Sequence, residues 1–234
     1  MHDTAILHAT KFFKTYLKNA KDLIIVDVGA QDVNGSLRSF SPPNCQYIGL
    51  DFIKAKGVEV VIDDLYSLPF NNNSVDVIVS SSCFEHSEFF WLLFNECLRI
   101  LKPTGLLYIN VPQNGDFHRY PVDCWRFYPD SGIALQNWGR RSGYNCVLLE
   151  SFIGAKNKDI WSDFVGVFLK DELYSSRYVD RIQDTKLEFK NGRLLNEKTI
   201  LNYVKRDIQN QSLRKMITNI LQSILRKLTK KLWI

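Results

Sequence analysis

Short apolar segments alternate with helical ones along the first 170 residues of the chain. The segment "LIIVDVG" at 23–29 is a continuous branched apolar run that ends in glycine, which is typical of a buried parallel strand. Strand-helix alternation of this kind predicts a three-layer α/β fold with a mainly parallel sheet, completed by a C-terminal antiparallel strand pair. Further strands are predicted at 45–51, 58–64, 75–81, 105–112, 146–154 and 162–170, and helices at 1–21, 87–101 and 130–144.

This pattern predicts one domain over residues 1–170, followed by a helical, basic extension over 171–234. Residues 205–234 contain eight Lys or Arg and a single acid, and within them 212–234 has apolar residues at helical spacing with basic residues between. Such a helix can lie on an anionic membrane surface, which would be the inner face of the cell membrane. Alternatively, it can dock on the domain of its own chain or on a second copy of the chain, which would form a homodimer. Nothing in the sequence favours nucleic acid as a partner.

Composition narrows the class of protein. The chain has 234 residues, of which 45% are hydrophobic, so it can bury a core. It has no apolar run near the roughly 20 residues of a membrane span, and we do not expect its N-terminus to be a signal peptide. The five cysteines are scattered, without a C-x-x-C pair. We therefore expect reduced thiols, a cytoplasmic location and no metal site.

Two strand ends indicate a ligand. Gly29 allows a tight turn where a ligand can approach the backbone, and Asp51 ends the second strand, where a carboxylate can accept hydrogen bonds from both hydroxyls of a ribose. Each residue could equally serve only its own turn. The loop "GAQDVNG" lacks the G-x-G-x-x-G spacing that binds a pyrophosphate, which favours a nucleoside ligand without phosphate over a nicotinamide cofactor.

Three further segments resemble a known family when they are taken in order. Asp64 precedes Leu68-Pro69-Phe70, residues 75–80 read "VDVIVS", and residues 99–105 read "RILKPTG". Over residues 20–170 this set resembles class I S-adenosylmethionine-dependent methyltransferases of the type-11-like group, which have a Rossmann-like fold. The family's G-x-G-x-G loop is replaced here by residues 29–33, "GAQDV", so the side chains at 31 and 33 should point away from the cofactor.

The resemblance implies that S-adenosylmethionine is the cofactor. It places Asp27, Gly29, Ala30 and Gln31 around the methionine moiety, Asp51 at the ribose and Phe52 beside the adenine. It also implies that Asp64 and the Leu65 N–H meet the adenine and that Ser81 and Ser82 lie near the sulfonium.

The segment "HRYPVDCWRF" at 118–127 follows the fifth strand, on the side where the acceptor of the methyl group should lie. It is similar to a motif of bacterial methyltransferases associated with surface polysaccharides and glycan assembly. A histidine is the usual proton acceptor near neutral pH, so His118 is the leading candidate for the general base. The other assignments are Asp123 as its orienting residue, His86 as a second catalytic candidate, and Tyr120, Trp125 and Arg126 as substrate contacts.

Structural interpretations of these residues remain open. Arg126 and Asp123 could form an internal ion pair, Trp125 could fill the core, and His86 could belong to the first turn of the next helix. For the whole chain, the leading hypothesis is O-methylation of a sugar hydroxyl in a glycan or its precursor. The alternatives are a lipid-like or other small acceptor, and a non-catalytic binding or assembly module with the same fold.

Overall fold

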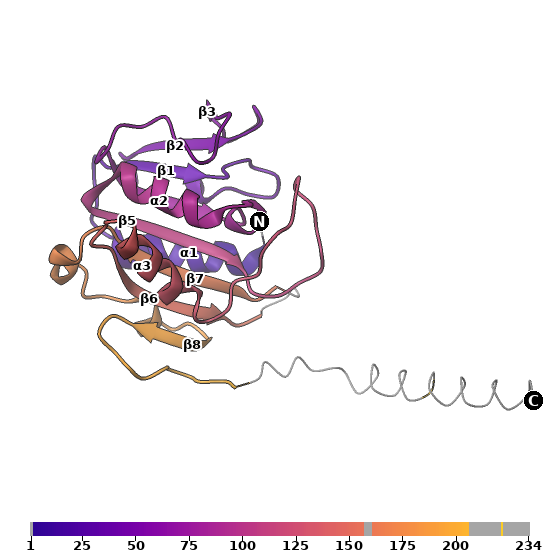
Figure 1. The fold of residues 1–234 in the computed structure, drawn as a ribbon, viewed down its shortest axis with the longest axis vertical. Helices are drawn as coiled ribbons and strands as arrows, with labels where there is room; N and C mark the ends of the chain where they lie inside the picture. The colour runs from indigo at the N-terminus through magenta and orange to yellow at the C-terminus, as the bar shows by residue number, and fades with distance from the viewer. Residues whose placement is uncertain (1, 157–160, 206–220, 222–234) are drawn as a thin grey trace, which may run out of the picture. The chain divides into compact units, whose positions relative to one another are not determined.

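The computed structural model describes residues 2–156, 161–205 and 221, and its centre is one mixed sheet (Figure 1). The sheet contains eight strands in the order β3-β2-β1-β4-β5-β7-β6-β8. Strands β1 to β5 pair in parallel, whereas β7 pairs antiparallel with both β5 and β6. The strands are β1 Ile24–Val28, β2 Gln46–Asp51, β3 Val60–Val61, β4 Val75–Ser81, β5 Leu101–Pro112, β6 Val147–Gly154, β7 Asp163–Leu169 and β8 Phe189–Leu194.

Helices cover both faces of this sheet, which confirms the predicted three-layer α/β fold. Helices α2 (Phe90–Ile100) and α3 (Ser131–Arg141) pack on one face, and α1 (Asp3–Tyr16) packs on the other (Figure 1). Alternate side chains of β1 enter the two cores: Val26 joins the α2 side and Ile25 the α1 side. Both faces of the strand are therefore buried, which explains its continuous apolar sequence.

The edge of the sheet beyond β2 is more irregular than the sequence pattern predicts. The strand expected at 58–64 is only two residues long, and its continuation turns away where Asp63 and Asp64 are exposed. Between β1 and β2 the structure has only the short 3-10 helix η1 (Leu37–Phe40) in place of a crossover helix. The loops at this edge are therefore held by local contacts.

Residues 171–203 differ from the predicted helical extension. They contain two 3-10 helices, η3 (Glu172–Arg177) and η4 (Ile182–Asp184), and then β8, which pairs with β6. The buried carboxylate of Glu150 fixes this segment, because Oε1 accepts from the N–H of Ile182 at 2.6 Å and Oε2 from that of Gln183 at 3.1 Å. Residues 1–203 accordingly form one compact unit, and 204–234 are a separate one.

The predicted amphipathic helix at 212–234 lies outside the described residues, apart from position 221. In the parts of the chain that the structure covers, no helix is both long and apolar enough to cross a bilayer. All five cysteines are free thiols, as the sequence predicts.

Candidate methyl-transfer site

The predicted site residues lie at or beyond the carboxyl ends of β1 to β5, which are neighbours in the sheet. In open α/β sheets a ligand binds beyond these ends, at the point where the strand order reverses. Here that point lies between β1 and β4, which pair directly. The long loop that follows β5 extends beyond the same end of the sheet (Figure 1).

The turn after β1 requires glycine. Gly29 has φ +84°, a conformation that glycine adopts without steric cost. A Cβ at this position would lie 2.6 Å from the Cβ of Cys83. The N–H groups of Gly29 and Ala30 both donate to the Leu50 carbonyl at 3.0 Å. The turn is therefore pressed against the residues after β4, with its backbone held in place.

Asp27 supports this turn from below. Its side chain is 4% exposed and accepts a hydrogen bond from the Tyr47 hydroxyl at 2.7 Å. Burial raises the pKa of the Asp27 carboxyl to about 7. Because its carboxylate is buried and bonded to the side chain of a core tyrosine, Asp27 supports the turn.

Asp51 keeps the accessible carboxylate that its predicted ribose contact requires. It is partly exposed at the end of β2, and its carboxylate accepts from the Gln31 N–H at 3.2 Å and from the Phe52 N–H at 2.7 Å. Carboxylate oxygens have several lone pairs, so these bonds leave acceptor capacity for two ribose hydroxyls. The adjacent Phe52 ring is 48% exposed, as expected for a residue that would cover an adenine.

The residues predicted near the adenine amino group and the sulfonium have different surroundings. Asp64 is exposed and accepts from the Tyr66 N–H at 2.8 Å, which caps its own turn, and Leu65 is buried. Ser81 and Ser82 have buried hydroxyls that make no hydrogen bond to any described residue. Such hydroxyls are costly unless a ligand or water meets them, so this position fits a bound cofactor.

The loop after β5 is pinned by one ion pair. The Arg126 guanidinium donates to both carboxylate oxygens of Asp123, at 2.6 and 2.8 Å, and to the Asp116 carbonyl at 2.9 Å. It lowers the pKa of the Asp123 carboxyl to about 2. Asp123 also accepts from the His118 N–H at 2.8 Å. These contacts match the internal-pair interpretation of Arg126, whose substrate contact stays a prediction.

The same loop presents aromatic faces and reaches across to the first turn. Trp125 is 38% exposed, and its indole N–H donates to the Ser87 carbonyl at 3.0 Å. Tyr120 is 55% exposed and donates its hydroxyl to Gln31 Oε1 at 2.9 Å. This contact joins the loop after β5 to the loop after β1, and the sequence pattern gave no indication of it.

Two histidines meet between the strand ends. His86 lies in the 3-10 helix η2 (Phe84–His86), separate from α2, so it is not in the first turn of that helix. Its ring contacts the His118 ring edge to face, with centroids 5.1 Å apart. Burial lowers the pKa of His86, and burial raises the pKa of the neighbouring Glu85 carboxyl to about 8. Sequence reasoning missed Glu85, because an acid beside a helix start is ordinarily exposed.

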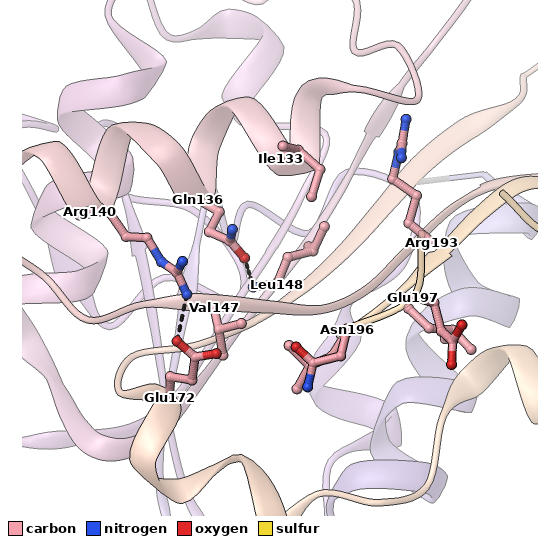
Figure 2. Close-up of a pocket in the computed structure, with 11 residues that line it drawn as sticks. Ile133, Gln136, Arg140, Val147, Leu148, Glu172, Arg193, Asn196 and Glu197 are labelled. Carbon is pink, nitrogen blue, oxygen red and sulfur yellow. Dashed lines mark hydrogen bonds and ion pairs between the residues drawn. The ribbon is translucent and has the colours of Figure 1, made fainter. Parts of the chain in front are cut away.

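A separate pocket of about 160 Å³ lies between α3, β6 and β8 (Figure 2). Two of its polar side chains are already engaged: Arg140 with Glu172 at 2.7 Å, and Gln136 with the Leu148 N–H at 2.8 Å. None of the residues that line it is one of the predicted site residues. It is therefore separate from the candidate methyl-transfer site.

Comparison with known proteins agrees with this geometry. The family model "Methyltransferase domain" matches residues 15–109. Malonyl-[acyl-carrier protein] O-methyltransferase 1 of Coxiella burnetii is 39% identical over 64 residues, which are 26% of this chain and 23% of that protein. The chain thus spans less than a quarter of the length of this curated relative.

Solved structures share the fold at low sequence identity. The 1,6-didemethyltoxoflavin-N1-methyltransferase of Burkholderia thailandensis, solved with S-adenosylhomocysteine, is 14% identical with a TM-score of 0.56, over 72% of this chain and 79% of that one. The [4+2]-cyclase SpnF is 13% identical with a TM-score of 0.53, over 71% and 81%. Residues 15–109 thus match a methyltransferase domain in sequence, and the chain shares its fold with solved structures that include an S-adenosylmethionine-dependent methyltransferase.

Proposed function

We propose that the whole chain transfers a methyl group from S-adenosylmethionine to a hydroxyl of a sugar, within a glycan or a glycan precursor. The observation that carries this proposal is the loop after β5. This loop presents exposed aromatic faces, brings His118 against His86 of η2, and is joined to the turn after β1 by the bond from Tyr120 to Gln31.

The bound cofactor supplies a methyl group on a sulfonium, which is already a good leaving group. The chain must therefore align the acceptor oxygen with that methyl group and assist the loss of the hydroxyl proton. Asp51 and the Gly29 turn would hold the cofactor. His86 and His118 are the groups that this site offers for activation of the hydroxyl.

The acceptor class follows from the mixture of groups in the loop. Tyr120, Trp125 and Phe117 expose flat rings, with 55%, 38% and 75% of their surface accessible, on which the apolar face of a sugar ring can lie. Exposed polar residues, Asp116 and Arg119, interrupt these rings. A lipid-like acceptor would instead favour a continuous apolar groove.

The test is a methyl-transfer assay on the full chain with S-adenosylmethionine and a panel of nucleotide sugars and oligosaccharides, read as S-adenosylhomocysteine formed. A screen for methylated glycans in a deletion strain would provide the natural acceptor. Methylation of lipid-like acceptors alone would contradict the sugar assignment. Cofactor binding without turnover on any acceptor would favour a binding or assembly module with the same fold.

A further inference from the structure

Glu85, His86 and His118 form a compact cluster of metal-ligating groups at the ends of β4 and β5. One ligand atom from each residue lies within 4.8 Å of the other two. Glu85 and His86 come from η2, directly after β4, and His118 comes from the loop after β5. The cluster therefore joins two loops that follow neighbouring parallel strands.

Glu85 has no role within the protein that accounts for its charge. Its side chain is fully buried, and neither carboxylate oxygen makes a hydrogen bond to any described residue. The nearby guanidinium of Arg126 already makes two short bonds to Asp123. A buried carboxylate that makes no hydrogen bond is strongly unfavourable, so this position calls for a cation or a proton.

The backbone of Glu85 shows that its position is fixed by the fold. Its carbonyl accepts from the N–H groups of Cys124 and Trp125, at 2.8 and 3.1 Å. These two bonds hold the loop after β5, residues 113–130, which we call the acceptor loop, against η2. The main chain at Glu85 is therefore held where the loops after β4 and β5 meet.

Both imidazoles have the arrangement of metal ligands. Nδ1 of His86 contacts the carbonyl oxygen of Val122, and Nδ1 of His118 lies 3.1 Å from the carbonyl oxygen of Asp116. A carbonyl can only accept, so these contacts favour the tautomer in which Nδ1 carries the proton and Nε2 keeps its lone pair, although Nδ1 of His118 also lies 3.5 Å from the Arg126 guanidinium. A second hydrogen bond to a carbonyl is the usual support of a metal-bound histidine. Nε2 of His86 also lies 3.8 Å from Glu85 Oε1.

We propose that Glu85, His86 and His118 bind a divalent transition-metal ion, of which Zn²⁺, Fe²⁺, Co²⁺ and Mn²⁺ suit two imidazoles and one carboxylate. Ligand atoms around such an ion are about 3.4 Å apart, so the cluster must contract by roughly 1 Å. His118 is on a partly exposed loop, and rotation of its side chain can supply this movement. Three protein ligands leave coordination positions open for an acceptor oxygen.

The chemical meaning of this ion rests on the proposed function. The acceptor hydroxyl binds the ion, which lowers its pKa, and its proton passes to solvent. A lone pair of the oxygen then forms the bond to the methyl carbon while the carbon-sulfur bond breaks and its electrons return to sulfur. The products are the methyl ether, neutral S-adenosylhomocysteine and one proton. His118 acts in this scheme as a ligand instead of a base.

The test measures metal binding directly. The untagged full chain is dialysed against a chelator and titrated with Co²⁺ and Zn²⁺, by calorimetry and by the visible absorption of bound Co²⁺. We expect one ion per chain, and at least tenfold weaker binding in Glu85→Gln and His118→Asn. Glu88→Gln is the matched control, because this exposed glutamate lies three residues away in the same segment and should bind as the wild type does.

Binding of S-adenosylhomocysteine is measured on every variant as an independent readout of fold and cofactor site. A wild-type chain that binds S-adenosylhomocysteine but no divalent ion overturns the metal site and leaves the proposed function standing. Glu85→Gln with wild-type metal affinity overturns it as well. A wild-type chain that does not bind S-adenosylhomocysteine would instead contradict the proposed function.

Discussion

Asp51 is the residue on which the cofactor site depends most directly. Its carboxylate is held at the end of β2 by the N–H groups of Gln31 and Phe52, at 3.2 and 2.7 Å, and we predict that it accepts from the ribose hydroxyls. Replacement by alanine removes the acceptor and leaves β2 intact, because the side chain is only partly buried. We therefore expect Asp51→Ala to fold and to bind the cofactor weakly.

The size of the loss can be worked from the hydrogen bonds. Two ribose hydroxyls donating to a charged acceptor contribute about 1.5 kcal/mol each at the low end of the measured range. Loss of both bonds amounts to about 3 kcal/mol of binding free energy, which raises the dissociation constant by roughly 10²-fold. The bonds from Gln31 and Phe52 are lost in the free and bound states alike, so they largely cancel. Asp51→Asn keeps one acceptor oxygen, and we expect an intermediate loss of about tenfold.

Calorimetric titration with S-adenosylhomocysteine is the assay, because this product is stable and needs no acceptor. The matched control is Asp63→Ala, which removes an exposed carboxylate near the same edge of the sheet. It should change the affinity less than threefold. If Asp51→Ala binds as tightly as this control while its unfolding temperature is unchanged, the ribose role of Asp51 is wrong.

The remaining predictions address the turn, the imidazoles, the buried acid and the C-terminal segment. Gly29→Ala should lower the free energy of unfolding by about 1–3 kcal/mol more than Gly143→Ala does. Both glycines have positive φ, but only a Cβ at position 29 would clash with Cys83. Equal losses of stability in chemical denaturation would show that the clash at position 29 relaxes. His118→Ala should keep cofactor affinity and lose turnover by about 10²–10⁴-fold in the acceptor assay; unchanged turnover would make it structural. The pKa of Asp27 is raised from 3.8 to about 7 in the folded protein. The stability of the wild type should therefore fall relative to that of Asp27→Asn as pH rises from about 4 to 7, by about 4 kcal/mol in all. The same pH dependence of the free energy of unfolding in both proteins would contradict this. Deletion of 212–234 should abolish co-sedimentation with anionic vesicles if that segment lies on a membrane; dissociation of a soluble dimer instead would support the subunit alternative.

The strands of the sheet could be predicted because burial on both faces leaves a direct record in the sequence. β1 and β4 are near-continuous apolar runs, and their bounds agree with the prediction within one residue at each end. β3 could not be predicted to the same precision, because an edge strand is fixed by one neighbour only and its apolar residues do not show where pairing stops. β8 escaped prediction for a related reason: it is an edge strand that pairs with β6 alone among the strands, and the segment before it is fixed by the buried Glu150, more than 30 residues earlier.

The cofactor turn was predictable from local requirements, whereas the acceptor side was not. Gly29 and Asp51 act through backbone geometry and strand position, both of which leave a local signal. Glu85 matters because the loop after β5 folds over it and excludes water. Its environment is made by residues almost 40 positions later, and no pattern of spacing reports that. The bond between Tyr120 and Gln31 joins residues 89 positions apart and is invisible for the same reason.

The contacts of the acceptor loop separate residues that shape it from residues that can meet a substrate. The charged groups of Arg126 and Asp123 bind each other and the loop backbone. We therefore expect these two residues to stay the same in related enzymes that methylate a different acceptor. Tyr120 and Phe117 keep most of their surface exposed, and their replacement costs the fold little. A loop with few regular hydrogen bonds can thus hold a fixed shape while its exposed rings are exchanged. The exposed rings should therefore determine which acceptor binds, and the ion pair should determine whether the loop keeps its shape.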